Sequence, residues 1–95
     1  MKTALELEFG IRLELARLRF PKIPRKKEVE EYSRVKWAWE DILRYVQEHS
    51  NYDAAKILED YMKESDNMIF AASPKAKPYF MEAHDLADYI YDLLF

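Results

Sequence analysis

The side chains best suited to chemistry lie near the C-terminus, where His84 and Asp88 are four residues apart. On a helix this spacing places two potential metal ligands on one face, together with Asp85 and Asp92. A zinc or di-iron site needs three or four protein ligands, and the Glu-x-x-His element of carboxylate-bridged bundles is absent. We therefore expect a solvated acidic face, with no metal and no other cofactor.

No part of the sequence is typical of an enzyme. The chain has no Cys, and its single glycine, Gly10, excludes the glycine-rich loops that bind phosphates. The possible hydroxyl nucleophiles are Thr3, Ser33, Ser50, Ser65 and Ser73, and none lies in an activating motif. Ser65 interrupts an apolar stripe, which predicts a buried hydroxyl bonded back to a helical carbonyl. We expect a non-catalytic protein.

Residues 17–27 are the most basic part of the chain. They include no acidic residue and six cations, which are Arg17, Arg19, Lys22, Arg25, Lys26 and Lys27. Such a patch can bind phosphates electrostatically, so a small nucleic-acid-associated protein that uses this basic turn is the alternative function. The net charge of −3 and the absence of a recognition motif make nucleic acid the less favoured partner.

The charge is divided unevenly along the chain. Residues 1–36 carry ten Lys or Arg against six acidic residues, whereas residues 37–95 carry five against twelve. The two parts therefore attract each other, either within one fold, between copies of the chain, or toward a charged partner.

Residues 3–20 contain conflicting signals. Thr3 and Glu6 match a capping box, Glu8 and Arg12 are spaced as a helical ion pair, and Pro21 ends the segment, all of which favour a helix. From Leu5 to Leu15 apolar and polar residues also alternate strictly, which is typical of a strand; over residues 4–16 such a strand would have to pair with another copy. We expect the helix. Wound as a helix, the segment is apolar on two faces: Leu7, Ile11, Leu15 and Leu18 form one, and Leu5, Phe9, Leu13 and Phe20 form the other.

Three further helices are expected, at residues 25–49, 51–70 and 78–95. Residues 25–49 carry the clearest amphipathic stripe, which includes Trp39. Ser50 or Asn51 is a candidate cap for the next helix, and Pro78 suits the first turn of the last one. Short connections between such helices favour a small all-α bundle of three to four amphipathic helices, mainly antiparallel, in a single domain over residues 1–95.

The first helix is the expected oligomerisation arm, and residues 25–95 are the expected core. Trp37 lies off the stripe that contains Trp39, and a large aromatic side chain outside the core is typical of an interface. The alternative is that the second apolar face of the first helix covers Trp37 within the monomer. The interaction candidates are Leu7, Ile11, Leu15, Leu18 and Trp37. They predict a protein–protein interaction module that forms a homodimer and that could also bind another protein.

The expected location is the cytoplasm. No apolar run approaches the length of a membrane span, and the N-terminus lacks the apolar region of a signal peptide. Salt would separate the two candidate functions, because nucleic-acid binding weakens steeply as salt rises, whereas burial of Leu, Phe and Trp is nearly indifferent to it.

Overall fold

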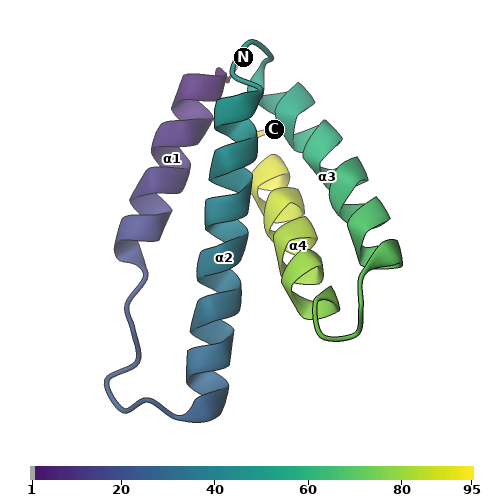
Figure 1. Cartoon of the computed structure of the whole chain (residues 1–95). Coiled ribbons are helices and arrows are strands. Elements are labelled where there is room, and N and C mark those ends of the chain that lie inside the picture. The colour runs from purple at the N-terminus through teal and green to yellow at the C-terminus, as the bar shows by residue number, and fades with distance from the viewer. Residues whose placement is uncertain (1) are drawn as a thin grey trace.

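The computed structural model describes residues 2–95, and this part of the chain is an all-α bundle (Figure 1). Its helices are α1 (Ala4–Arg17), α2 (Lys26–Glu48), α3 (Ala54–Ala71) and α4 (Lys77–Leu94). The predicted fold class is confirmed. Residues 2–95 contain no strand, so the alternative of an intermolecular strand over residues 4–16 is wrong. No helix in this range is long and apolar enough to cross a membrane.

Helices that follow each other in sequence run antiparallel, while α2 and α4 run in the same direction (Figure 1). Helix α4 packs against both α2 and α3, and α1 packs along α2. Helix α2 ends and α3 begins at the turn of residues 49–53, and the two helices diverge from it. Helix α1 is therefore at one edge of the bundle.

The ends of α1 follow from its sequence. The Thr3 side chain accepts from the Glu6 backbone and the Glu6 side chain accepts from the Thr3 backbone, so the predicted capping box is confirmed. The helix ends at Arg17, three residues before the predicted end at residue 20. Pro21 disfavours helical backbone at the residue before it, and Leu18 is already extended.

The start of α3 differs from its prediction. Neither Ser50 nor Asn51 caps the helix; the cap is Asp53, whose carboxylate accepts from the Lys56 backbone at 2.9 Å. The Ala54 backbone donates to the Lys2 carbonyl at 3.2 Å, which ties the beginning of α3 to the segment that leads into α1.

The hydrophobic core receives side chains from all four helices. Trp39 is buried as predicted, and Ser65 is buried with its hydroxyl 3.0 Å from the Met62 carbonyl, which confirms that prediction too. The predicted core of residues 25–95 is too small, because α1 contributes Ala4, Leu7 and Ile11. The other buried apolar residues are Ala38, Trp39, Ile42, Val46, Ala54, Ile57, Leu58, Tyr61, Ala83, Ala87 and Ile90.

The two faces of α1 predict unequal responses to truncation. We expect Ile11→Ala to lower the free energy of unfolding by about 3 kcal/mol, because it leaves a cavity at a fully buried position. Leu5→Ala, on the exposed side of the same helix, should change it by less than about 0.5 kcal/mol. Urea denaturation at low protein concentration measures both. Equal effects would show that α1 is not anchored through its Ile11 face.

Candidate functional site

The inner face of α1 is used by the fold itself. Leu7 and Ile11 are only 3% and 2% exposed, and Leu15 and Leu18 are half-buried against the core. In the folded chain the two buried side chains cannot also contact a partner. The sequence-based choice of this face for an interface therefore conflicts with its place in the core.

The outer face of α1 consists of Leu5, Phe9 and Leu13, one helical turn apart. Their exposed fractions are 74%, 63% and 43%. The sequence shows this face as the second apolar stripe of α1, but it does not show which stripe lies inside. Three large apolar side chains in one row therefore remain on the surface of the folded chain.

A groove of about 150 Å³ separates α1 from α4 beside the outer face. Trp39 of α2 and Ile90 lie in its lining, together with Gly10 of α1 and Leu93 of α4. Glu6 and Glu14 are its acidic residues. Leu93 is also strongly exposed, so apolar surface continues from the groove onto α4.

Gly10 has no structural requirement within the single chain. Its backbone angles are ordinary, and a Cβ added there would meet no atom within 4 Å. A glycine inside a helix costs about 1 kcal/mol relative to alanine. The folded chain therefore shows no close approach or special backbone angle that would offset the cost of this glycine.

A polar contact fixes α1 to α2. Glu8 accepts from Arg12 at 2.9 Å and from Gln47 of α2 at 3.1 Å. These donors, Arg12 first, hold the pKa of Glu8 below its usual value. This contact joins α1 to α2 in the orientation in which Ile11 is buried and Phe9 is exposed.

Trp37 lies on another side of the bundle. It is half-buried, and its ring meets those of Tyr79 and Phe80 at the start of α4 edge-on, with centroids 5.7 and 5.3 Å apart. Trp37 is therefore covered by residues of its own chain, and these belong to α4 and not to the second apolar face of α1. Trp37 and the outer face of α1 therefore do not form one surface.

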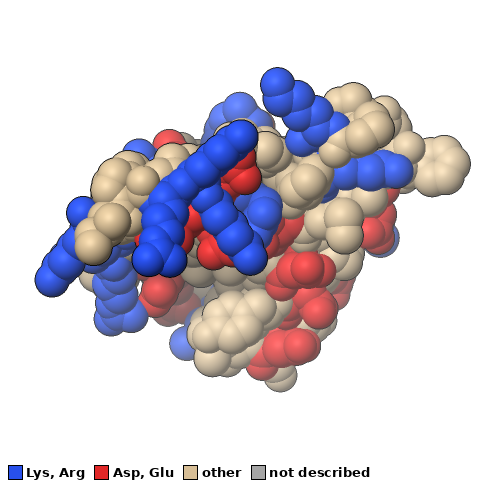
Figure 2. Space-filling model, turned by 90° about the horizontal axis from the view of Figure 1, so that it is seen from below, with Lys and Arg blue, Asp and Glu red and all other residues tan. Residues whose placement is uncertain are grey.

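The basic turn is divided between paired and free cations. Arg17 pairs with Glu14 at 2.8 Å, and Arg19 donates to the Ala16 and Leu18 carbonyls at the end of α1. The remaining four, Lys22, Arg25, Lys26 and Lys27, are exposed and form no ion pair among residues 2–95. Figure 2 shows Lys and Arg side chains gathered at this end of the molecule, with acidic side chains among them.

His84 connects α4 to α3 and belongs to no group of metal ligands among residues 2–95. Its Nε2 lies 3.1 Å from a carboxylate oxygen of Asp66 in α3, and its Nδ1 lies 3.8 Å from Asp85. Across residues 2–95, no group of three or more His, Asp or Glu residues could hold a metal ion. His84 thus contributes to the contact between α3 and α4.

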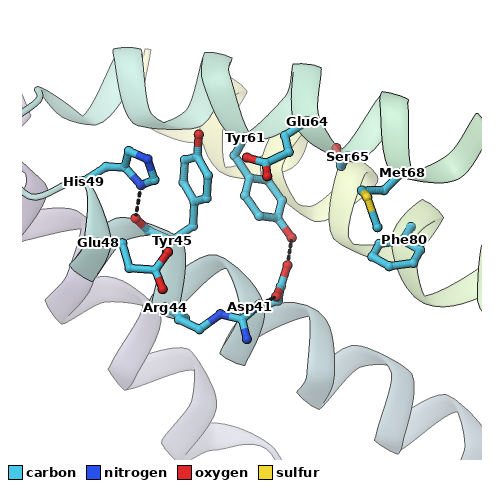
Figure 3. Close-up of a pocket in the computed structure, with 10 residues that line it drawn as sticks. All are labelled: Asp41, Arg44, Tyr45, Glu48, His49, Tyr61, Glu64, Ser65, Met68 and Phe80. Carbon is cyan, nitrogen blue, oxygen red and sulfur yellow. Dashed lines mark hydrogen bonds and ion pairs between the residues drawn. The ribbon is translucent and has the colours of Figure 1, made fainter. Parts of the chain in front are cut away.

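A second cleft, of about 450 Å³, lies between α2 and α3 and was not anticipated from the sequence (Figure 3). Tyr45 of α2 and Tyr61 of α3 cross it, with ring centroids 5.2 Å apart and an interplanar angle of 75°. The Tyr61 hydroxyl donates to Asp41 at 2.6 Å, and Asp41 also pairs with Arg44. The other residues of the lining are Glu48, His49, Glu64, Ser65, Met68 and Phe80.

The hydroxyl groups of both tyrosines in this α2–α3 cleft have pKa values above the usual value for tyrosine. Burial, and then the negative charges of Glu64 and Asp60, raise the pKa of Tyr45 to about 12. Burial and the hydrogen bond to Asp41 raise the pKa of Tyr61 as well. The cleft therefore disfavours any additional negative charge.

These shifts predict a loss of stability at alkaline pH. The folded chain keeps tyrosine protons that the unfolded chain releases above about pH 10, so the free energy of unfolding should fall as pH rises through the window from 10 to about 12. Urea denaturation at about pH 9 and about pH 11 measures the change. The fall should be smaller in Tyr45→Phe than in the wild type. An equal fall in both proteins would contradict this account of Tyr45.

The comparisons with known proteins give no family for this chain. No protein-family model, no curated protein and no solved structure matches it.

Proposed function

We propose that the protein is a small, non-catalytic, cytoplasmic interaction module that forms a homodimer through the outer face of α1. The observation that carries the proposal is the exposed row of Leu5, Phe9 and Leu13 on a helix whose opposite face is already buried. In the single chain these side chains remain in water, and a contact that covers them gains the hydrophobic free energy that they lack.

The charges beside this row favour a second copy of the chain as the occupant. Glu6 and Arg17 lie along the same flank of α1, one near each end. When two copies of α1 meet antiparallel across a two-fold axis, each Glu6 lies near Arg17 of the partner subunit. The ion pair between Arg17 and Glu14 is exposed, so Arg17 can exchange partners at little cost. The charges at the two ends of this flank are thus complementary across the two-fold axis.

The same arrangement gives Gly10 a role. The register that brings Glu6 opposite Arg17 of the partner subunit also brings Gly10 opposite Leu13 of the partner subunit. A position without a side chain, beside an apolar groove, leaves room for that leucine. The dimer therefore supplies the requirement for glycine that is missing in the single chain.

A charge introduced into the row of Leu5, Phe9 and Leu13 should dissociate the dimer. We expect the wild type to sediment at about twice 11.5 kDa and Phe9→Glu to sediment as a monomer, because the new carboxylate would be buried in the contact and would face Glu14 of the partner subunit. Phe70→Glu is the matched control, since Phe70 is almost fully exposed at the far end of α3. Sedimentation velocity of the three proteins measures the effect.

Charge exchange tests the antiparallel orientation. Glu6→Arg and Arg17→Glu should each weaken the dimer, and the double variant should restore it, because each pair is then again of opposite charge. A wild type that remains monomeric up to about 1 mM, or one that Phe9→Glu and Phe70→Glu affect equally, would refute the proposed homodimer.

Gly10→Ala should have opposite effects on folding and on association. Removing the helical glycine should raise the free energy of unfolding of the monomer by up to about 1 kcal/mol. The added methyl group should weaken the dimer by about tenfold, because it occupies space that the partner needs. Urea denaturation of dilute protein and sedimentation equilibrium measure the two quantities. A variant that gains stability and dimerises as well as the wild type would show that Gly10 is not at the interface.

A nucleic-acid-associated protein remains the second candidate. It is supported by the four exposed cations Lys22, Arg25, Lys26 and Lys27, which have no acidic partner among the described residues. Exposed Phe20 lies in the same segment and offers a ring for base stacking. Steep weakening of binding with salt distinguishes this function from association through the outer face of α1.

A further inference from the structure

We propose that residues 18–27, the α1–α2 tip, bind the surface of a bilayer that contains anionic lipids. This segment consists of the connector between α1 and α2 and the first two residues of α2. Its cations attract the lipid headgroups, and the side chain of Ile23 enters the boundary between the headgroups and the acyl chains. The inference goes beyond the homodimer and is independent of it, because it uses no residue of α1.

The position of the α1–α2 tip makes it accessible to a flat surface. Residues 18–25 contain no helix and lie at the lower end of the bundle in Figure 1. In that view they reach further down than the turn between α3 and α4. A flat surface that approaches this end therefore meets the tip before the rest of the bundle.

The charge of the tip suits an anionic surface. Its exposed cations without an ion pair among residues 2–95 are Lys22, Arg25, Lys26 and Lys27. The nearest acidic residues in the sequence follow on α2, at Glu28, Glu30 and Glu31. Figure 2 views this end, and Lys and Arg side chains lie in front of acidic ones there. An approaching surface thus meets positive charge first, and each cation near anionic lipids raises binding about fivefold.

Ile23 favours a lipid surface over a nucleic acid. Its side chain is 75% exposed, and cations precede and follow it in the sequence. A single exposed apolar residue is ordinary, but one among cations at a projecting end matches the composition of segments that bind at bilayer surfaces. A nucleic acid stacks its bases on aromatic rings and would leave this aliphatic side chain without a partner.

The shape of the tip is set before any contact. Pro21 and Pro24 fix their φ angles on either side of Ile23. The ring of Phe20 meets that of Tyr32 on α2 edge-on, with centroids 5.4 Å apart, and this contact joins the connector to α2. Because these features restrict the backbone, less conformational entropy is lost when the tip binds.

The test is flotation of the full chain with lipid vesicles on a density gradient. Vesicles of phosphatidylcholine with about 30 mol% phosphatidylglycerol should carry the protein upward in about 0.1 M NaCl, whereas phosphatidylcholine alone should not. Raising NaCl to about 0.5 M should release most of the protein, because salt screens the headgroup charge.

Two matched variants test the apolar contact. Ile23→Ser should lower the partition coefficient onto anionic vesicles at least about fivefold, because no side chain then enters the acyl boundary. Phe70→Ser removes a larger and more exposed apolar side chain at the end of α3, and it should change the coefficient less than about twofold.

Two double variants test the charge. Lys26→Gln combined with Lys27→Gln should lower the partition coefficient at least about tenfold. Lys75→Gln combined with Lys77→Gln removes two exposed lysines at the turn between α3 and α4 and should lower it less than about threefold. All the substituted side chains are exposed, so none of these changes removes a core contact, and circular dichroism of each variant checks that the chain is folded.

The proposal is overturned by absence of flotation with anionic vesicles, by equal flotation with neutral ones, or by equal effects of Ile23→Ser and Phe70→Ser. A fluorescently labelled DNA duplex, titrated at the same salt, tests the other polyanion. DNA binding that the Lys26 and Lys27 double variant weakens and Ile23→Ser leaves unchanged, without flotation, would assign the tip to nucleic acid and refute the lipid contact.

Discussion

The packing of α4 between α2 and α3 sets the positions of the other helices. Ala83 and Ala87 on α4 are completely buried, and so is Ala38 on α2. Small side chains allow helix axes to approach closely, and α4 uses this to contact both of its neighbours along its length. With α4 in that place, α2 and α3 cannot close on each other beyond their connecting turn. The α2–α3 cleft is the space that remains.

The same constraint determines the surroundings of α1. Helix α4 already covers one side of α2, so α1 packs along a different side at the edge of the bundle. Its inner face enters the core through Ile11, and the groove against α4 stays open above Trp39. The position of α1 therefore decides which of its two apolar faces completes the fold and which stays exposed.

The uneven distribution of charge along the sequence becomes an uneven distribution over the surface of the folded chain. Cations from the first part of the chain lie at the end that carries the connector between α1 and α2, and carboxylates from the second part line the α2–α3 cleft. Among residues 2–95, the close contacts between a basic side chain and a carboxylate that join different helices are those of Arg34 with Glu82 and of His84 with Asp66. The remaining surface charge is available for ligands or partners.

Local signals predicted much of the helical structure. The capping box at Thr3, the burial of Trp39 and the back-bonded hydroxyl of Ser65 depend on residues within one or two turns, and each was correct. The face of α1 that enters the core was not predictable in this way, because both stripes have helical spacing and only the position of α2 selects Ile11 over Phe9. The α2–α3 cleft was missed for a related reason. Tyr61 fits a core stripe, and nothing local shows that its hydroxyl reaches Asp41 twenty residues earlier.

A dilution series followed by two-dimensional amide NMR tests most directly whether two copies meet at the outer face of α1. We expect the signals of Leu5, Phe9, Gly10, Leu13 and Arg17 to change together with concentration, while those of the α2–α3 cleft and of Trp37 stay constant. Spectra that do not depend on concentration, or changes confined to the basic turn, would contradict it.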